Sequence, residues 1–228
     1  MGFENFDHDR YCAERLQLAF RKFIWEFSDE DSESAGATCR KLLNDETYRF
    51  KGGSVGQMPE EFTQRTIVAE VLNALGYTIT HHPAELVKDE RTQPDIKLEN
   101  VGEKCVGIVE CKALNRERNG REAIENLKDP YLERNSFAKY KKYPNMKYLV
   151  GIATDGFDWK LRVKDIEAGE LVPEFGGTYS LVDDSNGLHY CYHSELKNGT
   201  NLHWPDIRRE LAENFVSTFS RRNLRERF

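Results

Sequence analysis

Helical periodicity marks both ends of the chain and one stretch between them. The predicted helices cover residues 7–28, residues 35–47, Pro59 to about Leu75, and Asp206 to Leu224. Pro59 is suited to the first turn of its helix, because proline lacks the N–H that would be unpaired there. Gly76 comes directly after this predicted helix, at the position where glycine commonly ends a helix.

Short β-strands are predicted in the middle of the chain. They cover Tyr77–His81, Pro94–Leu98, Val106–Lys112, Tyr148–Thr154 and Phe157–Val163. Asp155-Gly156 is a strong hairpin signal between the last two strands. A helical stretch over residues 121–142 separates the third strand from the fourth, and residues 170–203 are polar and glycine-rich with short strand-like pieces. This order of elements predicts an α/β fold with a mixed sheet.

Composition places few limits on this interpretation. Hydrophobic residues make up 39% and charged residues 32% of the 228 residues, which is ordinary for a globular protein. No stretch approaches the roughly 20 apolar residues that span a bilayer, so we expect no membrane partner and a cytoplasmic location. The five cysteines are scattered without a C-x-x-C pair, which indicates reduced thiols rather than a disulfide framework.

Charge is unevenly distributed along the chain. The net charge is −6, but residues 112–147 carry ten Lys or Arg against five Asp or Glu, a local excess of +5. The last residues, 221–227, are basic as well. We predict that Lys139, Lys141 and Lys142 follow a DNA backbone, although a solvated helix end explains them equally well.

The candidate chemistry lies in two neighbouring strands. Pro94-Asp95 begins the second strand, and the third strand ends in Glu110-Cys111-Lys112. Strand alternation puts Glu110 and Lys112 on one face and Cys111 on the other. If the hairpin is centred between Gly102 and Glu103, Asp95 lies opposite Glu110, since 95 + 110 = 102 + 103. Opposed residues have Cβ atoms roughly 4.5–5.5 Å apart, so both carboxylates could hold one cation.

This oxygen-rich set suits Mg²⁺, with Mn²⁺ also possible, and the backbone carbonyl of Cys111 is a plausible further ligand. Such a metal activates water and neutralises charge on a phosphate. Lys112 would orient or deprotonate the water and stabilise the developing negative charge. The simpler interpretation of the same residues is a salt-bridged hairpin.

A third acid is expected from the preceding helix, where Glu61 and Glu70 compete. On a wheel of 100° per residue, Val68, Val71, Leu72 and Leu75 define the buried face. Glu61 falls within that arc and Glu70 nearly opposite it, so we predict Glu61 as the helix acid. Gln64 also lies on the inward side and is predicted to contact nucleic acid. An exposed first turn, favoured by the helix dipole, remains an alternative for both Glu61 and Gln64.

These residues resemble the PD-(D/E)xK nuclease superfamily, and more narrowly the nuclease domain of type I restriction motor subunits and of fused restriction–methylation enzymes. The resemblance covers about a hundred residues, from Glu61 to Trp159. Its main pieces are Thr63-Gln64-Arg65, Leu72-Asn73-Ala74-Leu75-Gly76-Tyr77, Pro94-Asp95, Val109-Glu110-Cys111-Lys112-Ala113 and Gly151 to Trp159.

The resemblance implies a restriction-endonuclease-like mixed sheet flanked by helices, with helical N- and C-terminal additions. The nuclease core would cover residues 57–165, between an N-terminal helical extension (1–56) and a C-terminal extension ending in a helix (166–228). By the same resemblance Asp95 and Glu110 are metal ligands and Lys112 is the catalytic lysine. The implied activity is Mg²⁺-dependent endonucleolytic hydrolysis of DNA in a restriction-type system, with restriction subunits or a self-dimer as further partners.

Two rival interpretations remain open. The fold could be catalytically inactive and serve as a nucleic-acid-binding or assembly module. Separately, His189, Cys191 and His193 alternate along a strand-like stretch and, with His203, form a possible Zn²⁺ set. A half-buried strand explains the same alternation more simply.

Overall fold

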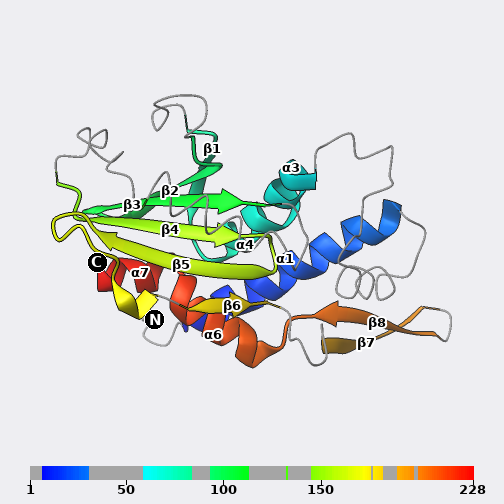
Figure 1. Cartoon of the computed structure of the whole chain (residues 1–228). Helices are drawn as coiled ribbons and strands as arrows, with labels where there is room; N and C mark the ends of the chain where they lie inside the picture. Colours follow the sequence, from blue (N-terminus) through cyan, green and yellow to red (C-terminus); the bar gives the residue numbers. More distant parts are fainter. Residues whose placement is uncertain are drawn as a thin grey trace, which may run out of the picture.

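The computed structural model describes residues 7–30, 59–83, 93–112, 132, 145–175, 177–181, 189–197 and 200–228. Its centre is a six-stranded mixed sheet with the order β1-β2-β3-β4-β5-β6 (Figure 1). The strands are β1 (Thr78–His81), β2 (Ile96–Gly102), β3 (Cys105–Cys111), β4 (Tyr148–Thr154), β5 (Asp158–Asp165) and β6 (Thr178–Ser180). β3 and β4 are parallel, and all other neighbours are antiparallel. The predicted α/β class with a mixed sheet is confirmed.

Helices from both ends of the described chain, and a helical stretch directly before β1, lie against this sheet (Figure 1). They are α1 (His8–Glu30), α3 (Pro59–Thr63), the π-helix η1 (Gln64–Val68), α4 (Ala69–Ala74), α6 (Arg209–Phe219) and α7 (Arg221–Arg227). A short 3₁₀-helix, η5 (Pro173–Phe175), precedes β6. A separate two-stranded sheet consists of β7 (His189–Lys197) and β8 (Thr200–Asp206).

Aromatic side chains join the helices to one face of the sheet. Trp159 of β5 is fully buried and meets Phe215 and Phe219 of α6 edge-on, with ring centroids 5.4 and 6.1 Å apart. Phe157, in the turn before β5, contacts Phe20 of α1 at 5.6 Å. Such rings bury large apolar areas, so they supply much of the packing free energy. Residues from all three predicted segments of the chain contribute to this one cluster. The predicted boundaries of the nuclease core, after residues 56 and 165, stay predictions.

The strand alternation of β3 separates the core from the candidate site. Val109 and Cys111 point to the helical core. Glu110 and Lys112 occupy the alternate positions and therefore the other face of the sheet. On that face Lys164 of β5, also buried, donates to the carbonyl oxygen of Leu132.

The β2–β3 hairpin has the predicted register at the end where the candidate site lies. Ile96 pairs with Val109 and Lys97 with Ile108, so the paired numbers sum to 205, as expected. The expected centre of the turn was wrong by one residue, because Gly102 pairs with Cys105 and the turn is Glu103-Lys104.

An irregularity in β2 between Leu98 and Gly102 absorbs the difference. Asn100 adopts a left-handed φ of 58° there, a conformation that asparagine tolerates better than most residues. A Cβ on the facing Gly107 would lie 2.6 Å from Val101 and 2.8 Å from Leu98. The irregular strand therefore needs glycine at position 107.

The other predicted elements match to within a few residues at their ends, and the larger differences are these. The strand predicted as Phe157–Val163 begins one residue later and ends at Asp165, and Asp155-Gly156 does form the turn before it, with Gly156 at φ 96°. The second predicted strand extends to Gly102. The single closing helix is two helices, because Ser220 is extended (ψ 144°) and its hydroxyl oxygen accepts from the Asn223 N–H as the cap of α7. The predicted helix at 35–47 lies outside the described residues, and so does that at 121–142 apart from Leu132.

Among the described residues, no helix combines the length and apolar character needed to cross a membrane.

Candidate functional site

Asp95 is held at the start of β2 by contacts on both its backbone and its side chain. Its carboxylate Oδ2 accepts a hydrogen bond from the Cys111 backbone N–H at 2.7 Å. Its carbonyl oxygen accepts from Gln64 Nε2 at 3.1 Å and from the His82 N–H at 2.8 Å. These bonds fix the acid against the end of β3 without any ligand. The register of the hairpin puts Asp95 on the face that carries Glu110.

Lys112 extends from the end of β3 between two acids from different elements. Its ammonium Nζ lies 3.9 Å from Glu110 Oε1 and 3.4 Å from Glu60 Oε2. The Lys112 and Glu110 side chains are only 15% and 12% exposed, so water screens their interaction weakly. The Lys112 backbone N–H donates to Thr154 O, which ties this end of β3 to β4. One ammonium and three carboxylates, those of Asp95, Glu110 and Glu60, therefore meet at the ends of two strands and a helix.

The electrostatic state of the cluster follows from burial and charge. Burial raises the pKa of Asp95, and the negative charge of Glu60 raises it further. The Cys111 N–H and the Lys112 ammonium favour the carboxylate and lower the pKa, but the net shift is upward. Burial acts to lower the pKa of Lys112, but the charges of Glu60, Glu110 and Asp95 together outweigh it, and the pKa is raised. Lys112 is thus a cation at neutral pH, suited to stabilising negative charge.

The helix acid beside Lys112 is Glu60, one residue before the predicted Glu61. The Glu61 carboxylate instead pairs with Arg65 at 2.6 Å. The physical reason is the π-helix at Gln64–Val68, where the Ala69 N–H bonds to Gln64 O, five residues back. Such a turn contains one extra residue. An α-helical wheel drawn backwards across it therefore assigns to Glu61 the direction that belongs to Glu60.

The structure also places three other sequence candidates, of which Gln64 differs from its prediction. Glu70 lies outside the cluster and pairs with Lys22 of α1 at 2.8 Å. Gln64, predicted to contact nucleic acid, is 4% exposed and donates to the Asp95 carbonyl. It therefore positions the acid from within the protein. Cys111 is fully buried with its thiol in the core, while its backbone amide binds Asp95, and burial holds the pKa of the thiol well above its usual value.

The remaining candidates lie beyond what the structure describes. Lys139, Lys141 and Lys142 fall outside the described residues. So do the side chains of the suggested zinc set, although the β7–β8 register pairs His203 with Tyr192 rather than with His189, Cys191 or His193. These predictions stay predictions.

The donor chemistry of the cluster fits a hard divalent cation. Asp95 and Glu110 supply carboxylate oxygens, which Mg²⁺ and Mn²⁺ prefer. Within the described part of the chain no three His, Cys, Asp or Glu side chains are grouped closely enough to enclose an ion. Mg²⁺ commonly binds through one or two carboxylates and keeps several of its waters, so Asp95 and Glu110 are donors of the kind that it uses.

Comparisons of the chain with protein-family models, with curated proteins and with solved structures found no match. The geometry of the site therefore carries the functional argument.

Proposed function

We propose that this chain is a metal-dependent endonuclease of the PD-(D/E)xK type that hydrolyses phosphodiester bonds in DNA. The observation that carries the proposal is the meeting of Asp95, Glu110 and Lys112 at one end of the β2–β3 hairpin. The mixed sheet is accordingly proposed to be a restriction-endonuclease-like core, and the protein to act as the nuclease part of a restriction-type system.

In this proposal Asp95 and Glu110 hold Mg²⁺, and the Cys111 carbonyl is a candidate third ligand. When bound, Mg²⁺ supplies an activated water and neutralises charge on the phosphate. Lys112 lies beside the ligands, so its ammonium stabilises the negative charge that develops on the phosphate oxygens. Gln64 and the Cys111 N–H keep Asp95 in place, so the site is preorganised and little reorganisation accompanies reaction.

The direct test is cleavage of plasmid DNA by the purified chain. Wild type is expected to convert supercoiled DNA to nicked and linear forms with Mg²⁺ or Mn²⁺ and to be inactive with a chelator. Asp95→Asn and Glu110→Gln are expected to lower the rate by a factor on the order of 10² or more while binding Mn²⁺ more weakly by calorimetry. Cleavage that persists in both variants refutes the proposal. DNA binding without cleavage under any divalent metal would instead favour the inactive binding module.

The helix acid can be tested by a matched pair of substitutions in one helical turn. Glu60→Gln is expected to lower the cleavage rate about tenfold or more, because Glu60 orients the Lys112 ammonium at 3.4 Å. Glu61→Gln is expected to stay within about twofold of wild type, because its carboxylate pairs with Arg65 away from the cluster. Single-turnover rates on one oligonucleotide duplex measure both. Equal losses in the two variants would contradict the assignment of Glu60.

A further inference from the structure

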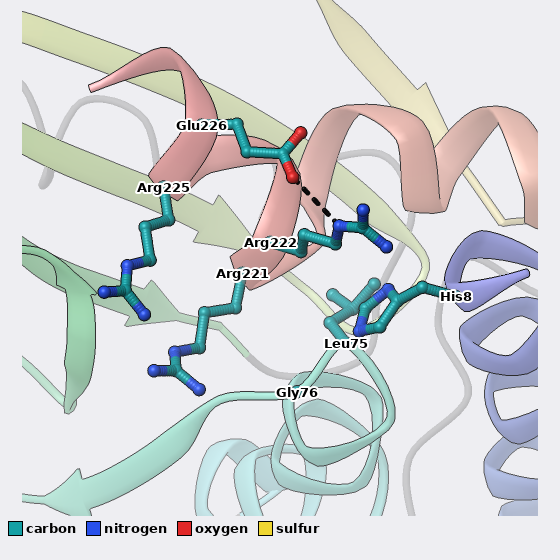
Figure 2. Close-up of a pocket in the computed structure, with 7 residues that line it drawn as sticks. All are labelled: His8, Leu75, Gly76, Arg221, Arg222, Arg225 and Glu226. Atoms are coloured by element: carbon teal, nitrogen blue, oxygen red, sulfur yellow. Dashed lines mark hydrogen bonds and ion pairs between the residues drawn. The ribbon is translucent and has the colours of Figure 1, made fainter. Parts of the chain in front are cut away.

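A cavity of about 450 Å³ lies where the start of α7 meets the end of α4. Its walls include His8, Leu75, Gly76 and three arginines, Arg221, Arg222 and Arg225. Figure 2 shows Arg221 and Arg225 extending from the same side of α7, one turn apart, whereas Arg222 extends toward His8. Over its seven residues α7 carries four arginines against Glu226, a net charge of +3 in a chain whose total is −6.

The arginines differ in how far they are already engaged. Arg222 Nε pairs with Glu226 Oε1 at 2.9 Å. Arg221 donates from Nε to the Asn100 carbonyl at 2.9 Å, which aims the end of its guanidinium and occupies one donor. Arg225 is exposed and has no hydrogen-bond or ion-pair partner within the described parts of the chain. Arg221 and Arg225 therefore retain N–H donors for a ligand.

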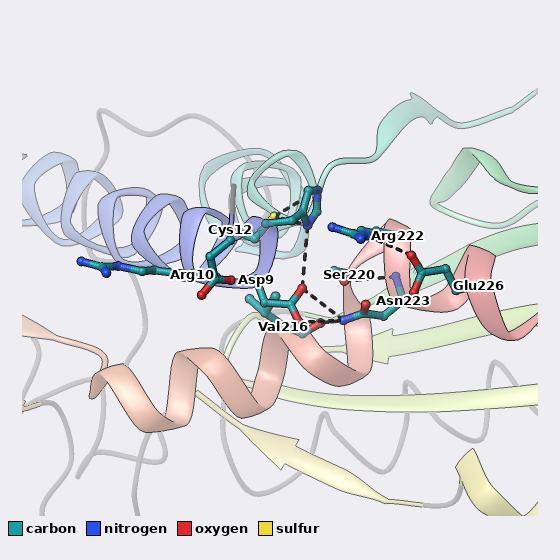
Figure 3. A network of polar contacts seen from close by, with 10 residues as sticks. Asp9, Arg10, Cys12, Val216, Ser220, Arg222, Asn223 and Glu226 are labelled. Carbon is teal, nitrogen blue, oxygen red and sulfur yellow. Dashed lines mark hydrogen bonds and ion pairs between the residues drawn. The ribbon is translucent and has the colours of Figure 1, made fainter. Parts of the chain in front are cut away.

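Polar contacts with α1 and α6 fix α7 in this position. Figure 3 shows Asn223 between Asp9 of α1 and Val216 of α6. The Asn223 amide donates to Asp9 Oδ1 at 3.3 Å and to the Val216 carbonyl at 3.3 Å. The Arg221 N–H also donates to the Leu75 carbonyl at 3.0 Å, and Leu224 is fully buried. The arginines are thus displayed from a rigid support.

The helix dipole explains only some of these positions, because it favours Arg225 and Arg227 in the last turn of α7. Arg221 and Arg222 occupy the first turn of α7, where the dipole of the helix disfavours cations. Guanidinium groups match phosphate oxygens with paired N–H donors, and a cluster of them in an acidic protein creates a local attraction for a polyanion. The arginines of the cavity, beside the single carboxylate of Glu226, therefore suit the oxygens of a phosphate group.

The cavity lies at the far end of the two elements that also carry the candidate active site. Asp95 and Asn100 are five residues apart along β2, which is about 16 Å for a strand. Glu60 in α3 and Gly76, just after α4, are 16 residues apart, which is about 24 Å at helical rise. Successive phosphates of one DNA strand are about 3.4 Å apart along the duplex axis, so a duplex of roughly six base pairs spans the distance.

We propose that Arg221 and Arg225 form a second contact point for the DNA backbone, binding a phosphate about 20 Å from the site of cleavage. The choice of DNA as the ligand rests on the proposed function. The contact supplies affinity and orientation and takes no part in bond breakage.

The test is DNA binding measured by fluorescence anisotropy in the presence of a chelator, where no cleavage can occur. Arg221→Gln/Arg225→Gln is expected to weaken binding of a 20-base-pair duplex about tenfold, with a log–log salt slope smaller by about 2, since each lost phosphate contact removes about 0.9. Arg10→Gln/Arg209→Gln is the matched control. It also removes two positive charges, and each of its arginines is paired with a glutamate four residues later.

The outcomes separate this inference from the nuclease proposal. If the protein never cleaves DNA but binds it through Arg221 and Arg225, this inference stands and the nuclease proposal is refuted. Binding by the double variant that equals that of the control overturns the inference. If the double variant does not fold, Arg225→Gln alone decides, with an expected slope change of about 1. Stabilisation of wild type by millimolar inorganic phosphate, with DNA binding unchanged in Arg225→Gln, also overturns it and assigns the cavity to a small phosphorylated ligand.

Discussion

Replacing Lys112 with alanine is expected to lower the rate of DNA cleavage by a factor on the order of 10² to 10³. The Lys112 ammonium lies 3.9 Å from Glu110 and 3.4 Å from Glu60, and Asp95 raises its pKa as well. Without it, three carboxylates face the negatively charged phosphodiester with no positive side chain between them. Single-turnover cleavage of a labelled duplex at saturating enzyme measures the effect on the chemical step.

Lys97→Ala is the matched control for this substitution. Lys97 lies on β2, its side chain is 13% exposed against 15% for Lys112, and it pairs with Glu99 at 3.0 Å. Both variants remove an ion-paired, largely buried lysine from neighbouring strands, so a general loss of stability would affect them alike. Comparable losses of cleavage in Lys97→Ala and Lys112→Ala, or full activity in Lys112→Ala, would remove Lys112 from the reaction.

Replacing Asp155 with asparagine is expected to raise the free energy of unfolding relative to that of wild type as the pH rises. The difference between the two proteins should grow by up to about 4 kcal/mol between pH 4 and pH 8. Burial raises the pKa of Asp155 from 3.8 to about 7, against the opposing effect of the hydrogen bonds that its Oδ1 accepts from the Phe157 and Asp158 N–H groups. Within the described residues, Oδ2 is buried without a hydrogen-bond partner. Asparagine keeps the accepting oxygen of the turn and carries no charge.

The sign follows from proton binding. Between pH 4 and pH 7 the folded state holds the Asp155 proton more tightly than the unfolded state, so the stability of wild type falls as the pH rises through this window. Above pH 7 the charged form is buried and no further loss follows. Urea unfolding of both proteins at pH 5, 6, 7 and 8 measures the difference, and any pH-independent cost of the amide cancels in the comparison.

Asp165→Asn provides the control. Asp165 Oδ1 likewise accepts from the backbone N–H groups two and three residues later, at 2.9 and 3.0 Å, but solvent reaches this turn. Its variant is expected to show no comparable gain with rising pH. A stability difference between Asp155→Asn and wild type that does not change with pH would show that Asp155 is already ionised in the folded protein at pH 5.

Local patterns in the sequence were sufficient for most of the sheet and for the acids on its strands. Strand β4 was predicted with the observed bounds, and the hairpin register that pairs residue 96 with residue 109 was correct at the end next to Asp95. Alternation along a strand is set by the backbone itself, so the face that carries Glu110 and Lys112 could be read from spacing alone. On the helix, a wheel of 100° per residue put Glu70 nearly opposite the buried face, and Glu70 pairs with Lys22 of α1 outside the cluster.

The remaining features depend on contacts between distant residues. The π-turn at Gln64–Val68 has no local signal, yet it rotates Glu60 rather than Glu61 toward Lys112. The bond from Gln64 to the Asp95 carbonyl joins residues 31 apart, and the break at Ser220 sets the direction of the arginines of α7. A sequence encodes the period of each element through backbone geometry. The rotation and orientation of one element relative to another depend on side-chain packing between residues far apart in the chain. Only the tertiary structure therefore determines which charges meet.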